Sequence, residues 1–184
     1  MTFAIPGDPL LDPTGKIFLV GFMGSGKTSL GRLLAGRMGW TFFDLDAALE
    51  EAEGASIMRI FVEKGEAYFR SVEQLTLREI AERPVHAIVA CGGGTFCSPE
   101  NQSLLRRHGL TVWLDQPFDR IWQRREELAR RRPLWRGEGP LRELYDSRVP
   151  FYQLAGVHLP VEEDQVPQAV ERLLAILRER HGVR

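Results

Sequence analysis

The 184-residue chain has 24 basic and 25 acidic side chains, a formal net charge of −1, and a hydrophobic content of 43%. This length and composition fit one folded domain, residues 1–184, with a sizeable core. The balanced charge gives no basis for binding nucleic acid or an anionic membrane surface. No apolar run reaches the roughly 18–20 residues that are needed to span a bilayer.

The N-terminal residues 1–15 contain three prolines but neither a basic start nor a long apolar stretch. We therefore expect a loose arm before the first strand rather than a secretion signal, and a cytoplasmic protein. Cys91 and Cys97 have the spacing of neither a zinc pair nor a redox CxxC motif. Two reduced thiols in or beside the core are the simplest interpretation.

Short apolar runs alternate with helical patterns along the chain. Strands are predicted over 17–20, 41–44, 85–90, 110–114 and 157–161. Helices are predicted from about 28 to 38, over 46–53, after Ser56, over 67–82, over 99–108, after Pro117, and over 166–177. Gly39 and Gly109 follow the first and fifth of these helices as C-terminal stop signals.

This alternation favours an α/β fold with three layers, in which helices cover both faces of a five-stranded parallel sheet. In such sheets ligands bind at the carboxyl ends of the strands. Three unusual loops, 21–28, 44–46 and 92–94, each follow a predicted strand. We therefore expect one site that is built by all three loops.

Residues 21–28, GFMGSGKT, match the pattern G-x-x-x-x-G-K-[ST] at every fixed position. Glycines let several backbone N–H groups face one phosphate, the next helix adds its dipole, and the lysine reaches the β- and γ-phosphates. The preceding strand and following helix argue against an accidental glycine-rich turn. The loop residues expected to hold the nucleotide are Gly24, Ser25, Gly26, Lys27, Thr28 and Ser29. The chain lacks the N-K-x-D motif of GTPases.

Two aspartates, Asp44 and Asp46, alternate at the carboxyl end of the second predicted strand. One can hold water on a Mg²⁺ ion that Thr28 ligates, while the other meets a substrate hydroxyl. A helix N-cap is the simpler alternative for Asp46. Asp115, after the fourth strand, is a rival for the metal, but a surface turn beside Pro117 accounts for it better.

Six motifs in order resemble the shikimate kinases. They are the loop with Met23, Phe43-Asp44-Leu45-Asp46, Gly65-Glu66-x-x-Phe69-Arg70-x-x-Glu73, Gly92-Gly93-Gly94, Arg132-Pro133-Leu134, and Arg148-x-Pro150-x-Tyr152. The resemblance runs from about Ile17 to the last helix. It implies a P-loop kinase related to the nucleoside monophosphate kinases, with a mobile lid over about 126–140. It also implies transfer of the ATP γ-phosphoryl group to the 3-hydroxyl of shikimate in aromatic amino-acid synthesis.

The resemblance further implies ATP and Mg²⁺ as cofactors and specific roles for individual residues. Lys27, Asp46 and Arg132 would act in catalysis, with Asp46 on the accepting hydroxyl and Arg132 closing over the phosphates. Asp44 would support the metal through water. The substrate residues would be Asp46, Arg70, Gly93, Gly94 and Arg148, with Glu73 orienting Arg70. Arg125 would stack on adenine, with Arg124 as its rival.

Three other functions stay open at this point. A gluconate kinase would also need arginines and a carboxylate, although Arg70, Arg148 and the triple glycine together favour shikimate. A nucleotide-binding module that has lost catalysis is opposed by the intact Lys27, Asp46 and Arg132. Arg130-Arg131-Arg132 as an RNA-binding patch is disfavoured by interleaved acids and by the lack of an aromatic platform. We expect a monomer with no nucleic-acid or membrane partner.

Overall fold

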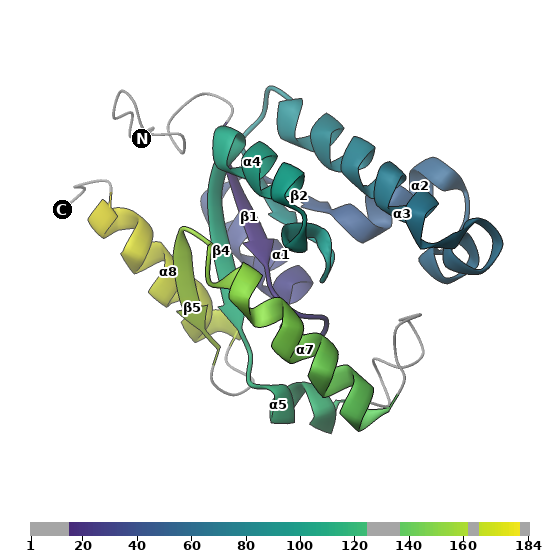
Figure 1. The fold of residues 1–184 in the computed structure, drawn as a ribbon. Coiled ribbons are helices and arrows are strands. Elements are labelled where there is room, and N and C mark those ends of the chain that lie inside the picture. The colour runs from purple at the N-terminus through teal and green to yellow at the C-terminus, as the bar shows by residue number, and fades with distance from the viewer. Residues whose placement is uncertain (1–14, 125–136, 162–165, 181–184) are drawn as a thin grey trace.

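The computed structural model describes residues 15–124, 137–161 and 166–180. Within these residues five strands form one all-parallel sheet in the order β2-β3-β1-β4-β5 (Figure 1). The three strands β2, β3 and β1 are adjacent, so their carboxyl ends open onto one edge of the sheet. The predicted loops at 21–28, 44–46 and 92–94 therefore meet, as expected.

The strands are β1 (Lys16–Val20), β2 (Thr41–Asp44), β3 (Ala87–Ala90), β4 (Gly109–Asp115) and β5 (Val157–Pro160). The helices are α1 (Lys27–Met38), α2 (Leu45–Glu53), α3 (Ile57–Glu82), the short 3₁₀ turn η1 (Thr95–Cys97), α4 (Pro99–His108), α5 (Phe118–Gln123), α7 (Glu138–Tyr152) and α8 (Val166–Arg180). No helix among the described residues is long and apolar enough to cross a bilayer.

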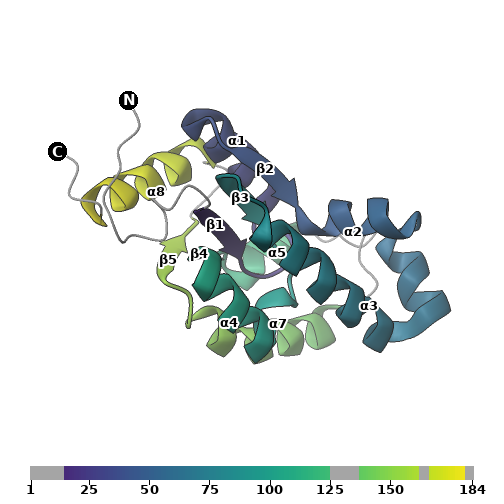
Figure 2. The same cartoon turned by 90° about the horizontal axis from the view of Figure 1, so that it is seen from above.

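The sheet lies between two layers of helices (Figure 2). One face packs against α1 and α8 through side chains such as Ile17, Leu34 and Leu173. The other face packs against α3, α4 and α7 through side chains such as Phe18 and Leu77. Every residue of β1 and β3 is buried, as expected for strands covered on both faces. The predicted three-layer fold is confirmed.

Local signals place several helix ends. Ser56 accepts a hydrogen bond from the N–H of Arg59 and caps α3, and Ser98 caps α4 with Pro99 in the first helical position. Asp44 caps α2 by accepting bonds from the N–H groups of Asp46 and Ala47. The N-cap alternative for Asp46 is therefore wrong, because Asp44 fills that place.

Besides shifts of one to three residues at element ends and the short turn η1, the structure differs from the predicted elements at three points. The third strand begins at Ala87 rather than at 85, because residues 83–85 form a turn in which Val85 N–H bonds the Arg83 carbonyl. The two helices predicted after Ser56 and over 67–82 form one element, α3, with a non-helical residue at Gly65. Helix α7 was missed, and its first residues, 138–140, overlap the expected lid.

Candidate active site

The phosphate loop connects β1 to α1, and glycines hold its shape. Gly24 and Gly26 have positive φ angles of 78° and 89°, which side-chain-bearing residues rarely adopt. Gly21 lies against β4, where an added Cβ would stand 2.7 Å from the Leu114 carbonyl oxygen. Because α1 begins at Lys27, its positive dipole end faces the concavity of the loop.

Lys27 is folded back onto the loop. Its Nζ donates hydrogen bonds to the carbonyl oxygens of Gly21 at 2.8 Å and Phe22 at 2.7 Å, and to Ser25 Oγ at 3.3 Å. The residue is only 8% exposed. A buried ammonium group is therefore held by backbone dipoles at the place where an anion would contact the loop.

Thr28, Asp44 and Asp46 connect the phosphate loop with the end of β2. The Thr28 hydroxyl donates to Asp44 Oδ2 at 2.7 Å, while Asp44 Oδ1 caps α2. Asp46 lies in the first turn of α2 and lines a pocket beside the loop. The described residues hold no cluster of three or more potential metal-ligating side chains. The Thr28 hydroxyl and the Asp44 carboxylate could hold Mg²⁺, which usually takes one or two protein ligands and completes its shell with phosphates and water.

The pocket beside the phosphate loop has an apolar wall and a charged wall. Ile57, Phe61 and Phe69 form the apolar wall, and the centres of the Phe61 and Phe69 rings lie 4.6 Å apart. The charged residues in its lining are Asp46, Arg70, Glu73 and Arg148. Met23 and the glycines 92–94 complete it. The pocket thus offers arginines for an anionic group, a carboxylate for a hydroxyl group and an apolar surface for the carbon atoms of a small molecule.

Arg70 is held by two carboxylates. Its Nη1 donates to Glu73 Oε2 at 2.9 Å, and its Nη2 donates to Glu66 Oε1 at 3.1 Å. Glu73 is 1% exposed, and its second oxygen accepts a 2.7 Å bond from the Thr95 hydroxyl. Burial alone would lower the pKa of the Arg70 guanidinium, but the charge and hydrogen bonds of Glu73, with those of Glu66, raise it.

The triple glycine leaves space for these charged groups. A Cβ on Gly92 would lie 2.9 Å from Glu73 Oε1 and 3.0 Å from Asp46 Oδ1. A Cβ on Gly94 would lie 2.9 Å from both terminal nitrogens of Arg70. A larger residue at either position would shift the ends of these charged side chains, so glycine at 92 and 94 allows their close approach to the backbone.

Arg148 enters the pocket from α7. It is 8% exposed, its guanidinium carbon lies 5.7 Å from the centre of the Phe22 ring, and no carboxylate among the described residues pairs with it. One turn further along α7, the Tyr152 hydroxyl donates to the Gly93 carbonyl and fixes α7 to the triple glycine. A buried cation without an acidic partner favours an anionic ligand.

A second cavity lies on the other side of the phosphate loop. Ser25 and Gly26 contribute to its lining, as do Arg120, Gln123 and Arg124 at the end of α5. Arg124 also reaches the loop, where its Nη1 donates to the Gly24 carbonyl at 3.4 Å. This cavity adjoins the phosphate loop, so a molecule bound at the loop could extend into it.

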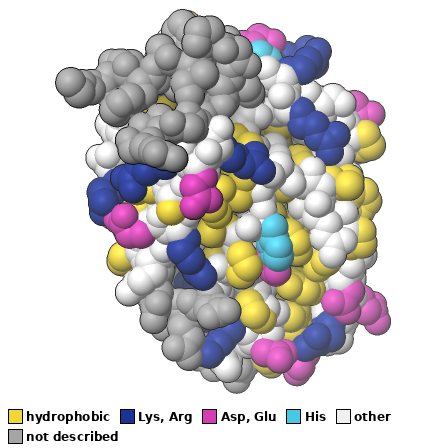
Figure 3. All heavy atoms as spheres, turned by 90° about the vertical axis from the view of Figure 1, so that its left-hand side faces the viewer, with side chains coloured by type: hydrophobic (Ala, Val, Ile, Leu, Met, Phe, Trp, Pro, Cys, Tyr) yellow, Lys and Arg dark blue, Asp and Glu magenta, His cyan; other side chains and the backbone are white. Residues whose placement is uncertain are grey.

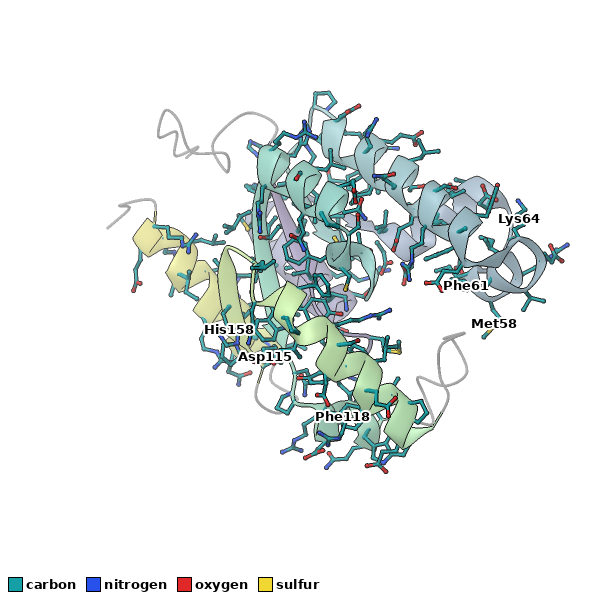
Figure 4. All side chains as sticks on the ribbon, in the orientation of Figure 1. Met58, Phe61, Lys64, Asp115, Phe118 and His158 are labelled. Atoms are coloured by element: carbon teal, nitrogen blue, oxygen red, sulfur yellow. The ribbon has the colours of Figure 1, made fainter. Side chains whose placement is uncertain are left out.

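Arg125 and Arg132, with most of the expected lid, fall outside the described residues. Asp115, the rival for the metal, is not among the lining residues of either cavity and is bonded to His158 at 2.8 Å. In Figure 4 this pair lies near β5, well away from Phe61 of the pocket that contains Arg70. The face that carries β5 and α8 shows acidic and basic side chains interspersed with apolar ones, not a continuous basic field (Figure 3).

The sequence interpretation assigned no site role to the apolar lining residues Ile57, Phe61 and Phe69, and it missed two residues that support the charged side chains of the pocket. Thr95 is completely buried and orients Glu73, and its only signal was its position directly after the triple glycine. Phe22 is a variable position of the phosphate-loop pattern, yet its ring supports Arg148. Neither role could be inferred from spacing, because each depends on contacts between segments far apart in the chain.

Comparison with known proteins agrees with this geometry. The family model described as shikimate kinase matches residues 23–178. The chain belongs to the shikimate kinase family. A shikimate kinase of Synechococcus sp. (strain JA-3-3Ab) is 42% identical over 154 residues, which are 82% of this chain and 80% of that protein. The shikimate kinase of Persephonella marina is 35% identical and covers 89% of this chain and 99% of its own.

Solved structures of the family have the same fold. The shikimate kinase from Acinetobacter baumannii in complex with shikimate has a TM-score of 0.85 and 32% identity, with 92% of this chain and 96% of that chain covered. The enzyme from Aquifex aeolicus has a TM-score of 0.77 and 31% identity over 90% and 97% of the two chains. A sugar kinase from Janibacter sp. HTCC2649, at 20% identity and a TM-score of 0.61, shares the fold alone.

Proposed function

We propose that the protein is a shikimate kinase, which transfers the γ-phosphoryl group of ATP to the 3-hydroxyl of shikimate and releases shikimate 3-phosphate and ADP. The observation that carries this proposal is Arg148, a buried cation that faces the pocket without an acidic partner among the described residues. Arg70 and Asp46 line the same pocket, so a carboxylate and a hydroxyl can be bound at once.

The phosphate loop would bind the triphosphate of ATP, and the cavity at the end of α5 would receive its base. Lys27 would exchange its bonds to the Gly21 and Phe22 carbonyls for bonds to the β- and γ-phosphates. Arg124 lines the base cavity, which supports it as a neighbour of the adenine. Arg125, the other candidate for stacking on the base, is adjacent to it in the sequence.

A Mg²⁺ ion bound with ATP would neutralise charge on the phosphates. Thr28 would ligate it directly, and Asp44 would hold its water, since the Thr28 hydroxyl and the Asp44 carboxylate already lie 2.7 Å apart. Asp44 is fixed in this position by its second task as the cap of α2. The two residues are thus oriented before any ligand binds.

At the acceptor end, Arg70 and Arg148 would clamp the carboxylate of shikimate between α3 and α7. The backbone of Gly93 and Gly94 would contact the ring substituents, and Ile57, Phe61 and Phe69 would pack against its carbon skeleton. Because Glu73 and Glu66 fix the Arg70 guanidinium, this side of the clamp is already oriented for a planar carboxylate.

Asp46 would accept a hydrogen bond from the 3-hydroxyl and direct an oxygen lone pair toward the γ-phosphorus. The proton of the hydroxyl would pass to the Asp46 carboxylate as the new bond forms, and Lys27 would stabilise the charge on the phosphoryl oxygens. Arg132 would close over the phosphates from the lid and exclude water. The product would supply the synthesis of aromatic amino acids.

The test is an ADP-release assay with purified protein, ATP and Mg²⁺. ADP should appear rapidly with shikimate and only at a background rate without it. Gluconate, the acceptor of the nearest alternative enzyme, should give no more than the background rate. Release that depends on gluconate but not on shikimate would replace the proposed substrate. No acceptor-dependent release, with ATP bound normally, would indicate a nucleotide-binding module instead.

A further inference from the structure

Helix α3 is broken between two groups of residues that line the acceptor pocket. Gly65 has φ 80° and ψ 171°, a conformation essentially confined to glycine, and it divides α3 into a first half, 57–64, and a second half, 66–82. In Figure 1, α2 and the first half of α3 lie at the edge of the molecule that is opposite α8. The angle at Gly65 therefore decides where the first half lies relative to the sheet.

Both halves of α3 contribute to the same pocket. Ile57 and Phe61 come from the first half, while Phe69 and Arg70 come from the second. The apolar contact between Phe61 and Phe69 crosses the break. A change of angle at Gly65 would thus move one part of the apolar wall away from Arg70, and the pocket would fit the acceptor less well.

Three polar side chains connect the segments that meet at this break. Lys64 Nζ, just before Gly65, donates to Glu53 Oε2 at 2.8 Å and to the Tyr68 hydroxyl at 3.1 Å. The Tyr68 hydroxyl, just after Gly65, donates in turn to the same Glu53 carboxylate at 3.0 Å. The Lys64 ammonium also lies 4.3 Å from the centre of the Tyr68 ring.

This group, Glu53, Lys64 and Tyr68, joins the last residue of α2 to both sides of the break. Lys64 and Phe61 leave the same short half of α3 in Figure 4. The side chain of Glu53 is 15% exposed, and that of Lys64 is 43% exposed. Each member contacts the other two, so the group can hold one angle rather than a range of angles.

We propose that Glu53, Lys64 and Tyr68 are positioning residues that fix the angle at Gly65 and so hold Phe61 and Ile57 in place for the acceptor. This inference rests on the proposed function, since the pocket is taken to bind shikimate. None of the three residues lines the pocket. Their effect should therefore appear in acceptor binding and not in the phosphoryl-transfer step.

A nearby ion pair provides a matched control. Arg59 and Glu63 are bonded at 2.8 Å within the first half of α3, and both side chains are at least half exposed. This pair has the same type of charge contact on the same segment but does not cross Gly65. Ordinary exposed pairs of this kind contribute little to stability. Loss of Glu63 should therefore leave acceptor binding unchanged.

The experiment compares Tyr68→Phe, Lys64→Met and Glu53→Gln with Glu63→Gln and with the conservative Lys64→Arg. We expect the KM for shikimate to rise about three- to tenfold in the first three variants, because each variant loses one or two hydrogen bonds that hold the first half of α3. The kcat and the KM for ATP should stay within about twofold of wild type. Glu63→Gln should have the same KM for shikimate as wild type, and Lys64→Arg should retain most of the affinity that Lys64→Met loses.

Amide hydrogen exchange over residues 57–64 gives a readout that does not depend on activity. Exchange there should be faster in Tyr68→Phe than in wild type or Glu63→Gln. Unchanged exchange would overturn the proposal whether or not the protein phosphorylates shikimate. An unchanged KM for shikimate in all three variants of an active enzyme would also overturn it, whereas an inactive wild type would contradict only the proposed function.

Discussion

The nucleotide side and the acceptor side of the site are built differently. The phosphate loop is one continuous stretch, and its cation, Lys27, is held by carbonyl groups of the same loop. The acceptor pocket contains one arginine from α3, Arg70, and one from α7, Arg148, and the two differ in their carboxylate partners. Arg70 has two carboxylate partners, whereas Arg148 has none among the described residues.

This difference indicates separate tasks. Because the Lys27 ammonium group already has hydrogen-bond partners within the loop, the loop can hold its shape before the nucleotide binds. Phosphate oxygens would then replace the loop carbonyls as partners of Lys27. A buried cation without a carboxylate lacks part of its compensation until an anion arrives. We therefore infer that the loop itself arranges the nucleotide side, and we propose that the acceptor carboxylate pairs with Arg148.

The largest expected effect is on the nucleotide side. Lys27→Met should reduce phosphoryl transfer below detection while the protein stays folded, because the charge that stabilises the phosphoryl oxygens is lost. ADP release and circular dichroism measure the two properties. A folded variant with near-normal turnover would show that the loop does not serve phosphoryl transfer.

Asp46 lies between the two regions and should have the next largest effect. Asp46→Asn keeps the shape of the side chain but cannot accept the proton, so kcat should fall by about 10²–10⁴-fold with little change in the KM for ATP. Steady-state kinetics in which each substrate is varied in turn measure kcat and the KM for ATP separately. A loss of only a few-fold would mean that Asp46 positions the hydroxyl without acting as its base.

The two arginines of the acceptor pocket allow the acceptor side to be weakened while the nucleotide side is left intact. Arg70→Ala and Arg148→Ala should each weaken shikimate binding by about 2–5 kcal/mol, with ATP binding nearly unchanged. Titration calorimetry measures both ligands. Unaltered shikimate affinity in both variants would contradict the carboxylate clamp.

The same two variants should differ in stability. Arg70→Ala leaves Glu73, which is 1% exposed, without its cation, whereas Arg148→Ala removes a cation that has no ion pair among the described residues. The thermal midpoint should therefore fall further in Arg70→Ala than in Arg148→Ala. The reverse order would show that the support of Arg70 is not what stabilises this side of the pocket.

The smallest effect concerns Cys91, which follows β3 beneath both regions. Burial raises the pKa of its thiol despite the nearby charge of Lys27. The free energy of unfolding is therefore unaffected by this thiol below its unfolded pKa of about 8.5. Above that pH the thiol ionises in the unfolded state but not in the folded state, so the free energy of unfolding falls, by about 2 kcal/mol at pH 10. The thermal midpoint of wild type should fall more between pH 8 and pH 10 than that of Cys91→Ala. Equal losses would contradict this assignment.

Features that depend on neighbouring residues in the chain were predictable from the sequence. The apolar strand before the phosphate loop and the glycines within it are contiguous, so β1 and α1 were located to within a residue or so. Helix α7 was missed because Pro150 lies inside it and only Leu141, Arg148 and Tyr152 among its described side chains are buried. Its apolar pattern is therefore too sparse to indicate a helix.

Features that depend on tertiary contacts were not predictable. The motif around Arg70 and Glu73 indicated an ion pair, but the near-complete burial of Glu73 follows from Thr95 and the triple glycine. Gly65 was part of a motif, yet its non-helical conformation depends on how α2 and α3 pack. The partners of Lys64 likewise depend on the return of the chain after the turn at Gly54.

The most direct test of the proposed function is identification of the product by phosphorus–proton correlation NMR. After incubation with ATP, Mg²⁺ and shikimate, we predict one new phosphomonoester signal, correlated with the proton on carbon 3 of the shikimate ring and equal in amount to the ADP formed. A phosphomonoester at another hydroxyl would contradict the placement of Asp46. ADP that accumulates with inorganic phosphate and no phosphomonoester would contradict the kinase assignment itself.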